Sequence, residues 1–169
     1  SALELVRLTG GNSSADPWLA VQAADAIRGM AELPLPLRAP LLAHVLDDAG
    51  PTELSNVFGV TVAAAKQKLY RARREAQRLA EQHPTVDQAI KPLLGEGMFE
   101  VAQRYMRYRD WDTATRWYLH ATALDKRAIA WIKDVSIMTS NPDVEREGLR
   151  CVMEQVVAQH PSDPWVLLE

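Results

Sequence analysis

The sequence contains one cysteine and four scattered histidines, which leaves few side chains that could hold a metal ion. Cys151 has no partner for an internal disulfide, as is usual for proteins of a reducing cytoplasm. No two histidines lie four residues apart and no Cys-x-x-Cys pair occurs, so the common zinc-binding spacings are missing. We therefore expect a cytoplasmic protein with no metal ion and no cofactor.

The sequence also lacks long hydrophobic runs and a glycine-rich phosphate-binding loop. No apolar run approaches the roughly twenty residues of a membrane helix, and no signal-like segment is present. Gly10-Gly11 is not followed by Lys-Ser or Lys-Thr, and Gly95-Glu96-Gly97 lacks the strand-to-helix context of a nucleotide-binding loop. We predict no membrane contact and no enzymatic activity, and we interpret Cys151 as a small buried residue of a helix.

Composition and charge are those of an ordinary globular protein. Of the 169 residues, 47% are hydrophobic and 24% are charged, which suits one or two small domains with a packed core. The net charge of -3 argues against a protein that coats nucleic acid with its whole surface, so any such contact has to be local. The chain begins at Ser1 and ends in the apolar run 165–168, and we expect it to be part of a longer protein.

Three helices are predicted between residues 33 and 82. Pro34, Pro36 and Pro40 favour extended or first-turn geometry, so we expect the first helix after them. Gly50-Pro51 ends that helix and starts a second one, because proline is favoured at the first helical position. The expected core residues of these two helices are Leu41, Leu42, Val45, Leu46, Leu54, Val57 and Phe58.

The third helix carries a basic face. Gly59 is expected to end the second helix in the left-handed conformation, and Thr61 to cap a third helix that runs to about Gln82. Its predicted buried residues are Val62, Ala65, Leu69, Ala72, Ala76 and Leu79. Its basic residues are Lys66, Lys68, Arg71, Arg73, Arg74 and Arg78. Glu75 is the first carboxylate among them, so this helix forms a local positive stripe.

A short helix, a tight turn with glycine and a longer basic helix is the arrangement that places a helix in the major groove of DNA. Side chains near the front of that helix read base edges, and cations further along bind phosphates. The expected base-facing residues are Ala63, Ala64, Lys66 and Gln67. The expected phosphate-binding residues are Lys68, Arg71, Arg73, Arg74 and Arg78.

Four short motifs in this region match a known family. They are Leu33-Pro34 with Arg38, Glu53-Leu54-Ser55, Phe58-Gly59-Val60-Thr61, and the run Ala-Lys-Gln-Lys-Leu-Tyr-Arg-Ala-Arg at 65–73. With them the segment from Leu33 to about Leu79 resembles the promoter-binding C-terminal domain of bacterial sigma factors, especially those of the extracytoplasmic-function type. The resemblance implies a transcription-associated regulator that binds promoter-like duplex DNA and works with RNA polymerase.

The sequence departs from that family in ways that leave a second hypothesis open. Arg38 follows Leu33 by five residues rather than four, and Ala49-Gly50-Pro51 replaces the usual Gly-x-Ser. The front of the third helix is Ala63-Ala64-Ala65, and alanine reads little beyond a thymine methyl group. The alternative is a protein-protein adaptor whose helix-turn-helix no longer reads DNA.

Beyond His83-Pro84 the sequence predicts antiparallel helical hairpins. A short helix from Asp87 is expected to close at Pro92 and Gly95. The core residues expected after it are Met98, Val101, Ala102, Tyr105, Ala114, Tyr118 and Ala121, with Asp110-Trp111 at the turn. The segment from about Gly95 to Ala128 resembles a tetratricopeptide repeat through Ala-x-x-Tyr at 102–105, Arg-Asp-Trp at 109–111 and Ala-x-x-x-Tyr-x-x-Ala at 114–121.

A second, looser repeat is expected to start near Ile129. Its predicted core residues are Trp131, Ile132, Val135, Val152, Val156 and Pro161. Such hairpins often bind peptides, and a groove for a protein partner or for self-association could contain Arg104, Tyr105, Arg107, Arg109 and Arg116. The alternative is a helical appendage whose arginines form a solvated charged face.

Together these patterns predict an all-α protein in three parts. Residues 1–15 form a linker, residues 16–83 a helix-turn-helix domain of sigma type, and residues 84–169 a domain of tetratricopeptide-like hairpins.

Overall fold

A computed structural model describes residues 17–82, 87–129 and 142–159, and every regular element in these ranges is a helix. The helices are α2 (Pro17–Glu32), α3 (Leu35–Asp47), α4 (Pro51–Phe58), α5 (Val62–Gln82), α6 (Asp87–Arg107), α7 (Trp111–Leu124) and α9 (Pro142–Gln159). The expected all-α class is therefore confirmed. Within the same ranges, no helix combines the length and the apolarity that a membrane span requires.

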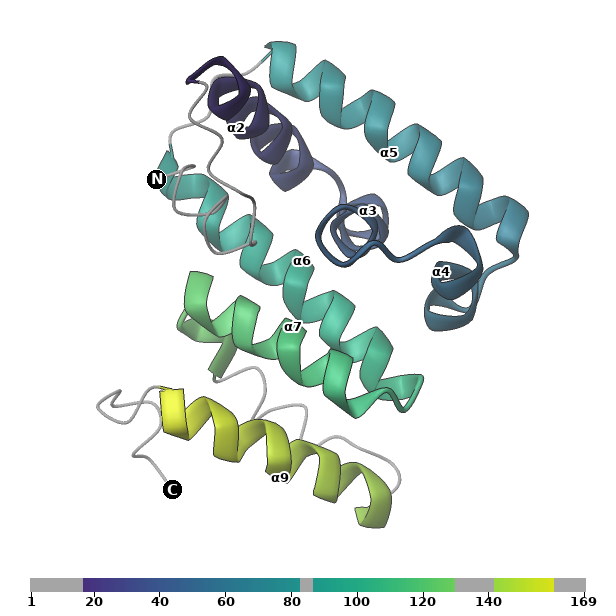
Figure 1. The fold of residues 1–169 in the computed structure, drawn as a ribbon, viewed down its shortest axis with the longest axis vertical. Helices are drawn as coiled ribbons and strands as arrows, with labels where there is room; N and C mark the ends of the chain where they lie inside the picture. Colours follow the sequence, from purple (N-terminus) through teal and green to yellow (C-terminus); the bar gives the residue numbers. More distant parts are fainter. Residues whose placement is uncertain (1–16, 83–86, 130–141, 160–169) are drawn as a thin grey trace.

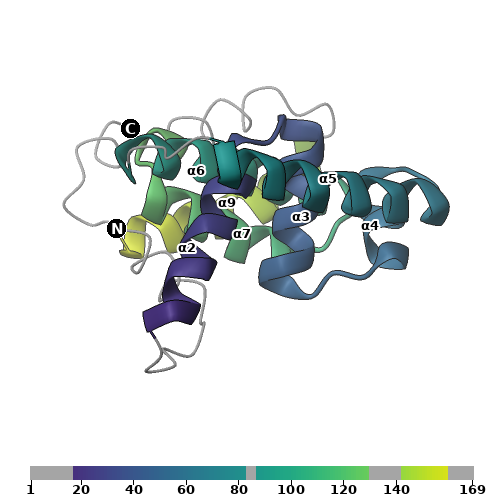
Figure 2. The same ribbon diagram turned by 90° about the horizontal axis from the view of Figure 1, so that it is seen from above.

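The helices form a stack with α5 at one end and α9 at the other (Figure 1). Helices α2, α3 and α4 pack on α5, while α6 packs on α2, α3 and α4 from the other side. Helix α7 packs on α6, and α9 packs on α7. Viewed along the stack, α4 and the start of α5 lie together at one edge of the molecule (Figure 2). Helix α5 thus has one packed face and one face that no described helix covers.

One hydrophobic core extends across the boundary that was predicted at residue 83. The same cluster of buried residues includes Leu42 and Leu54 before that boundary and Tyr105, Trp117 and Val156 after it. All seven core residues predicted for the first hairpin are buried. The predicted residues Trp131, Ile132, Val135 and Pro161 lie outside the described ranges, as does the N-terminal linker.

The local signals at the turns are confirmed. Gly59 has a φ of 65° and ends α4 in the left-handed conformation. The hydroxyl of Thr61 accepts a hydrogen bond of 3.1 Å from the Ala64 N–H and caps α5. Asp110 caps α7 in the same way, because its carboxylate accepts a 3.1 Å bond from the Thr113 N–H.

Two helix boundaries were predicted wrongly, both at prolines. Helix α3 already begins at Leu35 and contains Pro40, and α6 continues through Pro92 and Gly95. A proline removes only one intrahelical hydrogen bond, and burial of the surrounding residues outweighs that loss in α3. Gly95 is a packing residue, since a Cβ built on it would lie 3.0 Å from the Cβ of Asp125.

Three apolar side chains lie on the surface although the sequence predicted them to be buried. Val45 is 50% exposed, and Val62 is 38% exposed at the first position of α5. Cys151 is exposed because the buried row of α9 is formed by Val152 and Val156, and Cys151 lies beside that row.

Candidate nucleic-acid interface

Helix α5 is amphipathic, and its two faces meet different surroundings. Ala65, Leu69, Ala72 and Ala76 are buried against α2, α3 and α4, and Leu79 is half-buried. This agrees with the predicted stripe apart from Val62. The opposite face of α5 points away from the stack (Figure 1), and all the basic residues of this helix except the half-buried Lys68 are exposed.

The predicted base-facing residues lie at the start of α5. Ala63, Lys66 and Gln67 are exposed, whereas Ala64 is half-buried. Lys66 has no ion-pair or hydrogen-bond partner among the described residues. Among the described residues, the front of α5 therefore presents one unpaired ammonium group, one amide and a methyl group of alanine.

The predicted phosphate-binding residues differ in their hydrogen-bond and ion-pair partners. Arg71 and Lys68 have no partner in the described part of the chain, and Lys68 is half-buried. Arg74 donates a long hydrogen bond of 3.4 Å to the Tyr70 hydroxyl, and its guanidinium lies 5.7 Å from the centre of that ring. Arg78 is paired with Glu75 and also donates a 2.6 Å bond to Gln82.

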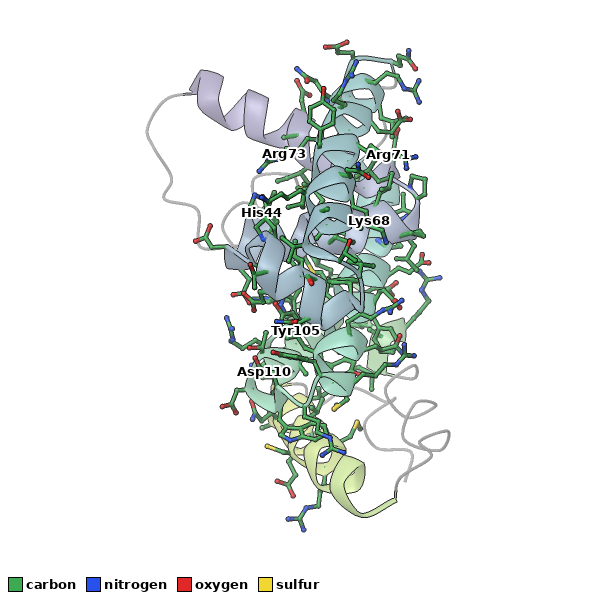
Figure 3. All side chains as sticks on the ribbon, turned by 90° about the vertical axis from the view of Figure 1, so that its right-hand side faces the viewer. His44, Lys68, Arg71, Arg73, Tyr105 and Asp110 are labelled. Atoms are coloured by element: carbon green, nitrogen blue, oxygen red, sulfur yellow. The ribbon has the colours of Figure 1, made fainter. Side chains whose placement is uncertain are left out.

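The cations fall on two sides of α5. Lys68 and Arg71 lie on one side, and Arg73 lies on the other beside His44 of α3 (Figure 3). The Arg73 guanidinium donates a 2.5 Å bond to Nε2 of His44, whose Nδ1 lies 2.9 Å from the Ala49 carbonyl oxygen. Because arginine can only donate, both bonds are satisfied by the tautomer of His44 that carries its proton on Nδ1.

The structure does not bring the five residues predicted for a groove on the hairpin together around one groove. These residues are Arg104, Tyr105, Arg107, Arg109 and Arg116. The Tyr105 side chain is 0% exposed, and its hydroxyl donates a 2.8 Å bond to Glu53 of α4. Arg116 forms an ion pair of 2.9 Å with Asp47 of α3.

Arg104 also contacts its neighbours, since it pairs with Glu100 at 2.9 Å and lies 5.7 Å from the centre of the Phe58 ring. Arg107 and Arg109 are exposed at the turn between α6 and α7. Most of the predicted groove residues therefore hold the hairpin against α3 and α4.

A groove of about 590 Å³ runs along one side of α5, and its lining includes residues outside the predicted site. Tyr70, which is 62% exposed, lines it together with Pro34 and Leu37 from the start of α3. The remaining lining residues are Arg71, Arg74, Glu75 and Arg78. The signal that could have identified Tyr70 is its position opposite the buried alanines of α5, where an aromatic ring has no packing role.

The charges in this groove are only partly compensated. The Glu75 carboxylate accepts a hydrogen bond from Arg78, and this bond lowers the pKa of Glu75. Glu75 therefore stays ionised beside the arginines. One carboxylate faces three guanidinium groups, so the groove keeps a positive balance.

The described residues contain no cluster of three or more side chains suited to a metal ion. No protein-family model, no curated protein and no solved structure matches this chain.

Proposed function

We propose that α5 binds duplex DNA with its exposed basic face, as the second helix of a helix-turn-helix in a bacterial transcription-associated protein. The observation that supports this best is the position of α5 at the end of the stack, with Lys66 and Arg71 exposed and without partners in the described chain. The hairpin of α6 and α7 lies on the far side of α3, so it leaves this face open.

The local geometry is compatible with entry into a major groove. The short helix α4 and the left-handed turn at Gly59 lead directly into α5, whose front carries Lys66 and Gln67. Arg71 and Arg73 lie on different sides of α5 (Figure 3), and we propose that each contacts the phosphates of a different strand. Since Ala63 and Ala64 offer no hydrogen-bonding side chain, we propose that phosphate contacts supply most of the affinity and that sequence preference is weak.

A salt series tests this proposal. Fluorescence anisotropy with a labelled duplex of random sequence should show a dissociation constant that rises steeply with salt, with a log-log slope of about 0.9 for each phosphate contacted. The double variant Arg71→Glu with Arg74→Glu should abolish binding. The matched control is Arg107→Glu with Arg109→Glu, which changes the net charge equally at the hairpin turn, outside α5, and should leave binding unchanged.

The competing function is assembly of proteins without DNA. It is favoured by the three alanines at the front of α5 and by the exposed Val45, which lines a second hollow of about 630 Å³ on the other side of α5. If the anisotropy of the labelled duplex showed no salt-dependent binding even at low ionic strength, the DNA proposal would be excluded and a protein-protein adaptor would be favoured. Light scattering of the same samples would show whether the chain associates with itself.

A further inference from the structure

The groove beside α5 contains an exposed aromatic side chain that duplex binding does not use. Tyr70 is the most exposed of the large hydrophobic side chains in the described chain, at 62%. It stands on the wall of the groove, opposite the apolar side chains of Pro34 and Leu37. Exposed aromatic surface contributes nothing to folding, but it gains free energy when a flat apolar ring is placed against it.

The ring of Tyr70 is held in place by its neighbour. The guanidinium of Arg74 lies 5.7 Å from the ring centre and donates to the hydroxyl at 3.4 Å. These two contacts limit the rotation of Tyr70 and so lower the entropy that a ligand has to remove. The Tyr70 side chain is thus partly ordered, and the part of its ring that Arg74 does not contact is open to solvent.

The arginines of the groove are spaced along the helix axis. Arg71, Arg74 and Arg78 follow each other at three and four residues, so they share one side of α5. From Arg71 to Arg78 the helix rises about 10 Å, at about 1.5 Å per residue. A single phosphate group cannot reach both ends of such a row, whereas successive phosphates of a strand can.

We propose that this groove binds single-stranded nucleic acid, with an unpaired base against Tyr70 and successive phosphates on the three arginines. A base inside a duplex has both faces covered by its neighbours, so only an unstacked base can use the tyrosine. A free nucleotide has the same chemistry but would reach only part of the arginine row. This site shares its arginines with the phosphate contacts of the proposed duplex interface, and the stacking of an unpaired base on Tyr70 is what distinguishes it.

Glu75 limits the affinity of this site. It accepts hydrogen bonds from Arg78 and repels an anionic strand at the same time. Replacing it by glutamine removes the negative charge, and with it both the repulsion and the ion pair of Arg78, while the amide oxygens of residue 75 and of Gln82 can still accept from that guanidinium. The variant Glu75→Gln is therefore expected to bind the strand more tightly, which a purely structural role for the groove does not predict.

The experiment compares three ligands by fluorescence anisotropy on the full chain. They are a labelled oligothymidylate, an abasic oligomer with the same number of phosphates, and thymidine monophosphate as a competitor. The oligothymidylate should bind at least roughly fivefold more tightly than the abasic oligomer, because stacking of a base on an aromatic side chain contributes that much. Thymidine monophosphate should compete weakly.

Variants separate stacking from charge. Tyr70→Ala should remove the difference between the two oligomers, Tyr70→Phe should keep it, and Glu75→Gln should tighten binding of both. Tyr108→Ala is the matched control, because Tyr108 is also exposed, at 49%, but lies on the hairpin turn away from the groove. Circular dichroism of each variant checks that the helices are retained.

Equal binding of the two oligomers by the unmodified protein, or an equal effect of Tyr70→Ala on both, would overturn the proposal. Strong competition by thymidine monophosphate would assign the groove to free nucleotides instead of a strand. If the salt series showed no duplex binding but the chain still preferred the oligothymidylate to the abasic oligomer, only the proposed function would be refuted. The two proposals can therefore fail separately.

Discussion

Arg38 of α3 donates a hydrogen bond of 2.8 Å to the carbonyl oxygen of Leu93 in α6, 55 residues further along the chain. The same guanidinium donates two bonds, of 3.0 and 2.8 Å, to the carbonyl oxygen of Leu33 just after α2. A single buried side chain therefore joins α2, α3 and α6. Burial lowers the pKa of Arg38, and the nearby Glu96 opposes that shift.

Replacing Arg38 should loosen this junction. Arg38→Leu leaves two carbonyl groups without their partner in a buried place, so we expect a loss of about 2–4 kcal/mol in the free energy of unfolding. Arg38→Lys should recover only part of it, because a single ammonium group cannot reproduce the planar fork. Urea denaturation followed by circular dichroism measures both, and a loss below about 0.5 kcal/mol for Arg38→Leu would contradict the bridging role.

Gly29 sets the distance between α2 and α5. A Cβ at this position would lie 2.0 Å from the carbonyl oxygen of Ala76, which is backbone and cannot turn away. Gly29→Ala should therefore destabilise the fold by about 1–3 kcal/mol or more. Gly50→Ala is the matched control, since nothing lies within 4 Å of its Cβ, and its effect should stay below about 1 kcal/mol, the usual cost of alanine at the N-cap position that Gly50 holds in α4. Thermal unfolding of the pair would disprove this account if both variants behaved alike.

Two buried tyrosines of the hairpin should respond in opposite directions to the loss of their hydroxyl groups. The Tyr118 hydroxyl is buried and has no hydrogen-bond partner among the described residues, so Tyr118→Phe should raise the free energy of unfolding by up to about 1 kcal/mol. The Tyr105 hydroxyl binds Glu53, and Tyr105→Phe should lower it by about 0.5–1.5 kcal/mol. Equilibrium unfolding in urea measures both signs.

The same tyrosines predict sensitivity to alkaline pH. Burial raises the pKa of Tyr105 and of Tyr118 above the ordinary value, and for Tyr105 the bond to Glu53 adds to the shift. The folded chain then holds these protons more tightly than the unfolded chain, so stability is complete below about pH 10 and falls as the pH rises further. Urea midpoints measured across this range check the effect, which should be smaller in the double variant with phenylalanine at both positions.

Arg109 occupies a position that glycine usually holds. Its φ is 66°, and the bonds from the Arg109 N–H to Met106 and from the Asp110 N–H to Tyr105 end α6 in a Schellman motif. Arg109→Gly should stabilise the fold by about 1 kcal/mol, because glycine adopts this conformation without strain. Arg107→Gly, inside the last turn of α6, should instead destabilise by about 1 kcal/mol. Differential scanning calorimetry compares the melting temperatures of the two variants with that of the unmodified protein. A lower melting temperature for Arg109→Gly would contradict the expected stabilisation.

Local features were predictable because they depend on residues close together in the chain. The bounds of α4 and α5, the left-handed turn at Gly59 and the caps at Thr61 and Asp110 follow from spacing and from the chemistry of a few neighbours. The buried rows of α5 and of the first hairpin follow from the helical period. The sequence could not reveal which cations of α5 are free, since Arg78 and Arg73 acquire partners through side-chain geometry and the packing of α3.

What the sequence determined by itself was the all-α class, the bounds of α4 and α5 and the placement of a basic face on α5, because hydrogen bonding and amphipathic period act within a few turns. Only the tertiary structure decided that α6 runs through Pro92 and Gly95, that Tyr105 binds Glu53 of α4 while Arg116 pairs with Asp47 of α3 at the surface, and that Tyr70 lines a groove. Those contacts join residues 52 and 69 positions apart, and the groove needs two helices side by side. Packing of distant helices, rather than any local pattern, determines such contacts.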